Sequence, residues 1–380
     1  MPPPVAASAP SLRTGLVREE TIVLGVRVLV TGGAGFIGSR LSVALSTRRP
    51  DWDVVAFDNL SRRGSELNLG RLRAAGVQFV HGDIRERQDL LELEPIDALV
   101  ECSAEPSVIA GLSGRTDYVI ETNLLGAYHA LELARRDGAQ IVFFSTSRVY
   151  PVARLNEVAL VEEATRFELA EEQAQPGVSA AGISEAFPLN GARTLYGASK
   201  LSAELLVEEY ASAFGLRTVV NRLGVVAGPW QMGKVDQGVF THWLLAHYFR
   251  RPLSYIGYGG SGKQVRDLLH VDDVVELLDD QLERPEHWAG VTANVGGGRA
   301  FSLSLQETTE ICRELTGNTL EIGKASEDRP GDVPVYLSDC SLLYQLTDWR
   351  PRRSPKAVLA DILHWVAENE AALGAALGGE

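Results

Sequence analysis

Short apolar runs recur along the N-terminal half of the chain, each followed by turn or charged residues. They predict five strands: 26–31, 53–57, 77–80, 96–101 and 141–145. Amphipathic stretches predict helices over 36–47, 116–136 and 198–213, the last ending near Gly215. Strands that alternate with helices predict an α/β fold, with a doubly wound parallel sheet of Rossmann type.

This periodicity weakens in two later parts of the chain. Residues 151–194 are acidic and rich in Ala, Pro and Gly, so we expect a long ordered loop there. From about residue 299 onward, short helix and strand signals are mixed. This mixture predicts a smaller C-terminal α/β lobe beside the sheet.

The first predicted strand runs directly into a glycine cluster. Gly33, Gly35 and Gly38 match the G-x-G-x-x-G spacing, and Gly32 begins the wider G-x-x-G-x-x-G spacing. A helix predicted directly afterwards would direct its N-terminus at phosphate groups. The candidate residues for binding a dinucleotide here are Gly32, Gly35, Phe36, Ile37 and Gly38. The alternative is an ordinary glycine turn in a parallel-sheet protein.

An acidic residue about 20 positions beyond the glycines separates these two interpretations. Asp58 stands there, at the end of the predicted strand 53–57. Its carboxylate can accept hydrogen bonds from a ribose and repel a 2′-phosphate, which favours NAD over NADP. Arg62 and Arg63 follow closely and weaken that preference.

Composition excludes several classes of protein. The chain has 380 residues, 45% of them apolar, which is enough for a sizeable core. A net charge of −14 argues against a nucleic-acid partner, and no apolar run is long enough to span a membrane. The three cysteines are too scattered for a disulfide framework or a metal cluster, so no metal is expected. Residues 1–24 lack signal-peptide features, so we expect a flexible tail on a cytoplasmic protein.

Three residues form a candidate catalytic set. Tyr196 and Lys200 are four residues apart at a predicted helix start, so both side chains project from one face. A nearby ammonium group stabilises a phenolate, which makes Tyr196 a candidate base and Lys200 its activator. Thr146 follows a buried strand to the ligand-binding edge of the sheet and is a candidate hydrogen-bond partner for the reacting oxygen. Tyr-x-x-x-Lys alone also matches many exposed helix faces, but the strand context favours catalysis.

These motifs, in this order, resemble the extended short-chain dehydrogenase/reductase family, the nucleotide-sugar epimerases and dehydratases. The resemblance extends from about Val26 to Trp365. Its seven motifs are Thr31 to Gly38, Asp58-Asn59-Leu60, His81-Gly82-Asp83-Ile84, Asn123-Leu124-Leu125-Gly126, Ser145-Thr146, Tyr196 to Lys200, and Arg266-Asp267. It implies NAD as cofactor, with Asn59, Asp83 and Ile84 among its contacts, and Asn123 supporting the active-site water and lysine.

The residues after the catalytic threonine narrow the chemistry that this resemblance implies. Sugar 4,6-dehydratases of the family carry an Asp-Glu pair there for water elimination, whereas this chain has Ser147 and Arg148. Without paired carboxylates, we expect hydride chemistry without dehydration. Segments 57–62, 145–150, 235–238 and 262–267 resemble the branch that inverts C2 of CDP-activated deoxyhexoses. The expected activity is therefore NAD-dependent epimerisation of a nucleotide sugar.

Eight residues are expected to contact the substrate by the same resemblance: Glu105, Ser147, Arg148, Gln231, Gln237, Gly238, Arg266 and Arg329. Guanidinium groups bind phosphates bidentately, so the last two arginines are expected to hold the diphosphate. A surface turn is the alternative for Arg329, and a loop carboxylate for Glu105. Glu101 also departs from the family, in which many relatives have histidine.

The resemblance also implies an organisation. Residues 25–223 plus 268–298 are expected to form the NAD-binding domain, and 224–267 plus 299–380 the nucleotide-sugar-binding domain. Relatives are commonly dimers or tetramers, so a homodimer or homotetramer is expected.

Two alternative functions stay open. A net NAD-dependent nucleotide-sugar oxidoreductase or decarboxylase would share every motif, and a non-catalytic dinucleotide sensor would share the fold.

Overall fold

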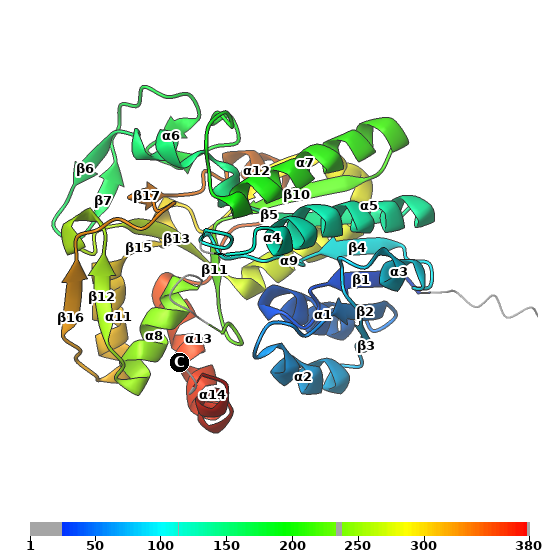
Figure 1. Cartoon of the computed structure of the whole chain (residues 1–380), viewed down its shortest axis with the longest axis horizontal. Helices are drawn as coiled ribbons and strands as arrows, with labels where there is room; N and C mark the ends of the chain where they lie inside the picture. The colour runs from blue at the N-terminus through cyan, green and yellow to red at the C-terminus, as the bar shows by residue number, and fades with distance from the viewer. Residues whose placement is uncertain (1–24, 113, 233–237, 378–380) are drawn as a thin grey trace, which may run out of the picture.

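Seven parallel strands form the central sheet of the computed structural model, which describes residues 25–112, 114–232 and 238–377 (Figure 1). The strand order is β14-β10-β5-β4-β1-β2-β3. The strands are β1 (Arg27–Thr31), β2 (Asp53–Asp58), β3 (Gln78–His81), β4 (Ala98–Glu101), β5 (Gln140–Thr146), β10 (Thr218–Leu223) and β14 (Val291–Val295). The doubly wound α/β fold is therefore confirmed.

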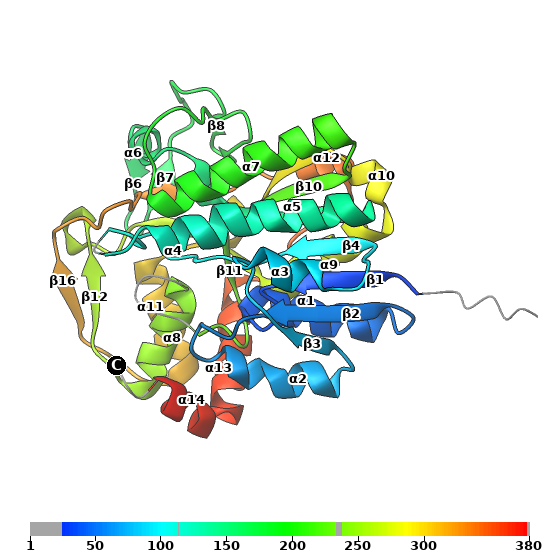
Figure 2. The same ribbon diagram turned by 45° about the vertical axis from the view of Figure 1, so that its right-hand side comes forward.

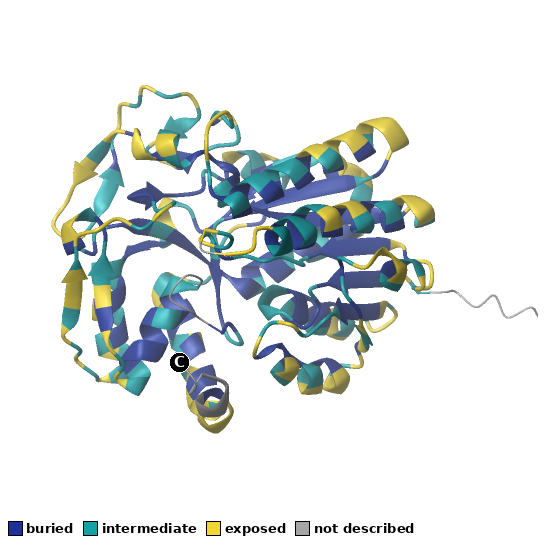
Figure 3. Ribbon diagram, viewed as in Figure 1, coloured by how far each residue is buried: buried dark blue, intermediate teal, exposed yellow. Residues whose placement is uncertain are grey.

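Helices cover both faces of this sheet, because successive residues of a strand point to opposite sides. Val28 and Val30 of β1 pack in one core cluster, and Leu29 between them packs in another. The first face carries α1 (Phe36–Arg48), α2 (Leu69–Ala74), α9 (Val271–Glu283), α10 (Pro285–Trp288) and α12 (Ser341–Leu346). The second carries α3 (Arg87–Leu91), α5 (Gly126–Asp137) and α7 (Leu195–Phe214), with α4 (Asp117–Ile120) against α7 (Figure 2). Figure 3 shows the strands buried between these two layers.

Two of the predicted helices differ in detail from the structure. Helix α7 starts before the predicted residue 198, because Thr194 caps it: its Oγ1 accepts a 3.2 Å hydrogen bond from the Gly197 amide. The helix ends at Gly215 in the left-handed conformation, as expected. The stretch 116–136 is divided into α4 and α5 by a π-helical turn, Glu121–Leu125, of the kind often found at functional sites.

A second, smaller sheet lies beside the first. It contains β11 (Val225–Ala227), β13 (Val265–His270), β15 (Ser302–Ser304) and β17 (Val335–Tyr336). Around it are α8 (Val239–Phe249), α11 (Leu305–Thr316), α13 (Pro355–Glu368) and α14 (Glu370–Leu377), with a two-stranded sheet of β12 (Leu253–Ile256) and β16 (Ile322–Ala325). The domain boundaries drawn from the sequence stay a prediction. No helix within the described ranges is long and apolar enough to cross a membrane.

The segment 151–194 has more regular structure than the loop expected from sequence. It contains α6 (Val152–Asn156) and two hairpins, β6 (Leu160–Glu162) with β7 (Phe167–Leu169) and β8 (Val178–Ser179) with β9 (Gly182–Ile183). The Ile183 amide donates to the Leu337 carbonyl at 2.8 Å, so the segment is attached to the region of β17. Strands of two or three residues are too short to produce a periodic pattern, which explains the difference.

Candidate active site

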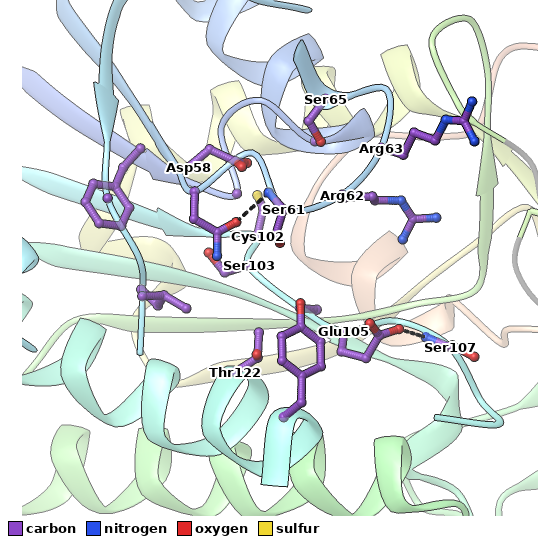
Figure 4. A pocket seen from close by; sticks show the side chains of 18 residues that line it. Asp58, Ser61, Arg62, Arg63, Ser65, Cys102, Ser103, Glu105, Ser107 and Thr122 are labelled. Carbon is purple, nitrogen blue, oxygen red and sulfur yellow. Dashed lines mark hydrogen bonds between the residues drawn. The ribbon is translucent and has the colours of Figure 1, made fainter. Parts of the chain in front are cut away.

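A cavity of about 380 Å³ opens at the carboxyl edge of the central sheet. It lies where the strand order reverses between β1 and β4, the usual ligand position in such sheets. The lining comes from the segments that follow β1, β2, β3 and β4, and includes Gly32, Asp58, Ile84 and Glu105. Figure 4 shows Arg62 and Glu105 on opposite sides of it.

The glycine turn after β1 has the shape that a dinucleotide pyrophosphate requires. Gly32 has φ of 61°, and a Cβ added to Gly38 would lie 2.2 Å from the Gly32 carbonyl oxygen. The turn therefore closes only with glycine at both positions. Gly35 precedes α1, whose first residues are Phe36 and Ile37, and no side chain caps this helix end. Its amides and positive dipole end thus suit an anion at the cavity.

Asp58 lies beside this turn at the end of β2. Its Oδ2 accepts a 3.1 Å hydrogen bond from the Ala34 amide and its Oδ1 a 2.8 Å bond from the Leu60 amide. Burial raises the pKa of Asp58, and these backbone bonds oppose the shift. A carboxylate on the cavity wall next to the glycines can accept hydrogen bonds from a ribose. The glycine turn and Asp58 therefore fit the dinucleotide expected from the sequence.

Asn59 and Asp83 interact with each other at the next edge of the cavity. The Asn59 Nδ2 donates to Oδ2 of Asp83 at 2.9 Å, and Arg85 donates to both carboxylate oxygens. These bonds, chiefly from Arg85, lower the pKa of Asp83 to about 2. Ile84 lines the cavity and leaves no room for a side chain at Gly126. The resemblance to the family implies that Asp83 and Ile84 contact the adenine of the cofactor, and this stays a prediction.

Asn123, in the π-helical turn, joins two parts of the site. Its Oδ1 accepts from the Glu105 amide at 2.8 Å, while its Nδ2 donates to the Glu105 carbonyl at 3.1 Å and to Ser199 Oγ at 3.0 Å. Ser199 in turn donates to the Tyr196 carbonyl at 2.8 Å. Asn123 therefore fixes the loop after β4 against the first turn of α7. Sequence reasoning missed Ser199, since a serine within a helix has no distinguishing pattern.

Tyr196, Lys200 and Thr146 converge at the same edge, and all three are buried. Burial raises the pKa of Tyr196, while hydrogen bonding with Thr146 and the positive charge of Arg148 oppose this shift. Lys200 Nζ lies 3.6 Å from Oε2 of Glu101 and 3.9 Å from the centre of the Phe143 ring. The predicted base and its hydroxyl partner are thus together, and Lys200 is paired with Glu101 at the end of β4.

Two arginines meet near this set. Arg148 Nη1 donates to the Gly331 carbonyl at 2.9 Å, and Arg266 Nη2 donates to Asp332 Oδ1 at 2.6 Å. Burial, together with the charge of Arg266, lowers the pKa of Arg148 to about 10. The segment that contains Arg329 is a turn, with the Asp332 amide donating to the Arg329 carbonyl at 3.1 Å. Sequence reasoning singled out Arg329 and missed Gly331 and Asp332, which make these contacts.

The other expected substrate residues lie in different surroundings. Glu105 lines the cavity and accepts a 3.0 Å bond from the Ser107 amide, as a loop carboxylate would. Ser147 begins the short turn after Thr146. The side-chain amide of Gln231 is hydrogen-bonded at both ends, since its Nε2 donates to the Val226 carbonyl and its Oε1 accepts from the Thr241 hydroxyl.

Gly238 contributes to the same packing as Gln231. It precedes α8 with φ of 73°, and a Cβ there would lie 3.0 Å from the Gln231 side chain. These contacts hold α8 against the end of β11. Gln237 lies outside the described residues.

Comparisons with known proteins agree with this geometry. The model of the NAD dependent epimerase/dehydratase family matches residues 28–296. CDP-paratose 2-epimerase of Salmonella typhi is 30% identical over 356 residues, 90% of this chain and 99% of that protein. A dTDP-glucose 4,6-dehydratase of Mycobacterium tuberculosis is 28% identical, over 91% of this chain and 94% of that protein.

A solved structure gives the same result. The UDP-glucose 4-epimerase of Thermus thermophilus, in complex with NAD, superposes with a TM-score of 0.71 and 27% identity. The match covers 90% of this chain and 99% of that one. With the glycine turn, Asp58 and the family match in agreement, NAD is the cofactor. The chain belongs to the NAD dependent epimerase/dehydratase family.

Proposed function

We propose that this enzyme epimerises a nucleotide sugar at C2, with a CDP-activated deoxyhexose as substrate. The observation that carries the proposal is the convergence of Tyr196, Thr146 and Lys200 beside the dinucleotide cavity. The similarity to CDP-paratose 2-epimerase supports the substrate class. Ser147 and Arg148 stand in place of a carboxylate pair, which favours epimerisation over the dehydration carried out by other relatives.

Each residue of the catalytic set has a distinct task. Bound NAD supplies hydride acceptance from the sugar carbon and hydride return to it. Tyr196 takes the proton of the C2 hydroxyl, while Thr146 hydrogen-bonds the same oxygen. The charge of Arg148 favours the phenolate. We assign the same task to the ammonium of Lys200, which lies four residues further along α7. After the 2-keto sugar turns over in the pocket, the opposite face of C2 is presented for hydride return and Tyr196 returns the proton to the C2 oxygen, so the reaction has no net redox change.

The substrate diphosphate would anchor the nucleotide during this turnover. Arg148 and Arg266 are close enough for their charges to repel, and Asp332 pairs directly with Arg266. A diphosphate would relieve this repulsion through bidentate bonds, with Arg329 from the same turn. Binding of the diphosphate, which does not itself react, then retains the keto intermediate. We assign Glu105 to the sugar side, where its charge would disfavour an acidic sugar.

The exposed face of α5 and α7 supports the expected homodimer or homotetramer. Leu125 in the π-helical turn, Tyr128 on α5, and Leu205 and Phe214 on α7 are exposed, and exposed apolar side chains gathered on one face mark protein–protein contact sites. We propose this face as the contact between subunits, and light scattering of the purified protein tests it. We also retain the cytoplasm as the expected location.

The first test of the proposed function uses the purified protein without added cofactor. Mass spectrometry of molecules released by denaturation should find NAD near one equivalent per chain. The same preparation should interconvert CDP-paratose and its C2 epimer with no NAD added. Turnover that consumes added NAD in proportion to product would instead indicate a net oxidoreductase or decarboxylase, and an absence of any turnover would favour a sensor.

A further inference from the structure

Lys200 has an unusual neighbour for a catalytic lysine. The carboxylate of Glu101 ends β4 and lies 3.6 Å from Lys200 Nζ, with the two side chains 1% and 2% exposed. Within the described part of the chain, neither Glu101 oxygen has a partner within hydrogen-bond distance. Lys200 is also in contact with the Phe143 ring. The pair is therefore a buried ion contact: burial raises the pKa of Glu101, and the charge of Lys200, followed by the backbone of Ser103, opposes this shift.

The remaining charges around Lys200 do not replace Glu101. Glu204, on the same helix, already forms a buried pair with Arg222, with contacts of 2.7 and 3.1 Å. Burial and the charge of Glu101 raise the pKa of Cys102 well above its usual range, so this thiol is neutral. Glu101 is thus the nearest available counter-charge for Lys200.

Burial without a counter-charge favours the neutral form of a lysine, and the pKa of a fully buried lysine can fall to about 5–6. Burial lowers the pKa of Lys200, and attraction to Glu101 opposes this shift. Around Tyr196 the other charged groups are Arg148, which favours the phenolate, and Glu105, which disfavours it. Glu101 itself acts on the phenol in two opposite ways: as a direct negative charge, and through the ammonium that it maintains.

We infer that Glu101 is a positioning residue that keeps Lys200 in place as an ammonium ion, and that through Lys200 it supports ionisation of Tyr196. This inference rests on the proposed role of Tyr196 as the base. It makes the end of β4 part of the proton-transfer apparatus, because Glu101 acts through its 3.6 Å contact with Lys200. Because the two effects of Glu101 on the pKa of Tyr196 are opposite, the direction in which that pKa changes without Glu101 shows which effect is larger.

The test is a titration of Tyr196 in the NAD-containing protein, followed by the ultraviolet absorbance of tyrosinate. Matched proteins carrying Tyr196→Phe supply the background to subtract. In Glu101→Gln, the midpoint for Tyr196 should rise by one pH unit or more, because Lys200 loses its charge. Glu101→Asp should remain near the parent protein. An unchanged or lower midpoint in Glu101→Gln would overturn the inference.

Two further variants separate the effect of Glu101 through Lys200 from a direct effect of charge on Tyr196. In a Lys200→Met background, Glu101→Gln should no longer raise the midpoint, since the ammonium is absent. Glu105→Gln should lower it, because that carboxylate acts on the phenol only directly. Persistence of the upward shift without Lys200 would overturn the inference. Because no sugar is added, a wrong substrate assignment leaves the result unaffected.

Discussion

Arg148 donates a 2.9 Å hydrogen bond to the carbonyl oxygen of Gly331, joining the turn after β5 to the segment before β17. One partner follows the central sheet and the other belongs to the smaller lobe. Arg148 also faces Tyr196, so the same guanidinium is near the proposed base and the proposed diphosphate site. The relationship places nucleotide anchoring and proton transfer next to each other.

Removing the second arginine of this site should weaken nucleotide binding. Arg266→Gln deletes a guanidinium that would bind phosphate, and hydrogen bonds to charged groups contribute about 1.5–3 kcal/mol. We expect the Kd for CDP, measured by calorimetry, to rise about tenfold or more. Arg250→Gln is the control, because Arg250 is exposed and binds Asn318. Equal affinities in the two variants would contradict the assignment.

Loss of the phenol should stop the reaction without disturbing the fold. Tyr196→Phe removes the proposed base, which contributes about 10²–10⁴-fold to catalysis, while NAD remains bound. Product analysis by NMR, together with the NAD content, measures both effects. Tyr248→Phe is the matched change elsewhere, since that hydroxyl donates to Glu370 at 3.1 Å on the surface of the smaller lobe. Near-normal turnover in Tyr196→Phe would exclude this phenol as the base.

The cap of α7 should matter for both stability and activity. Thr194→Ala removes the 3.2 Å bond to the Gly197 amide, which should lower the free energy of unfolding by about 1 kcal/mol. Ser354→Ala removes the equivalent cap of α13, at 3.3 Å from the Ala357 amide. Urea unfolding should give similar losses, but only Thr194→Ala should reduce kcat, since Tyr196 lies in the first turn. A similar kcat in both variants would argue against this positioning role.

Asp83 should contribute to stability in acid. Its folded-state pKa of about 2 lies below the unfolded value of about 3.9. A depressed carboxyl pKa stabilises the fold above the unfolded pKa, and that stabilisation is lost as the pH falls through the folded pKa. Asp83→Asn should therefore show a shallower decline in unfolding free energy between about pH 4 and pH 2. A parallel decline in both proteins would mean that Arg85 does not hold this carboxylate in solution.

The sequence predicted the parts of the fold that depend on local patterns. Apolar runs located five of the seven strands of the central sheet to within two residues, all but β10 and β14, and Gly215 marked the end of α7. Thr194 was missed as a cap because the segment before it lacks periodicity. The two-residue strands β8 and β9 depend on contacts with Leu337, far along the chain, which local patterns do not contain.

For the candidate site too, the sequence predicted what depends on local spacing and missed what depends on distant contacts. Glycines and Asp58 were predictable, since their spacing is fixed by one turn between a strand and a helix. The contact of Glu101 with Lys200 joins β4 to α7, and Asp332 reaches Arg266 across 66 residues. Such pairs are set by the packing of the sheet and the smaller lobe. Sequence reasoning identified Arg266 and Lys200 but not their partners.

The most direct measurement of the proposed epimerisation follows deuterium at C2 of CDP-paratose. The purified protein, with no NAD added, should convert this substrate to its C2 epimer with the deuterium retained at C2, as NMR and mass spectrometry would show. Retention follows because the hydrogen leaves as hydride and returns to the same carbon. Washout of deuterium into water, or a product unchanged at C2, would contradict the account.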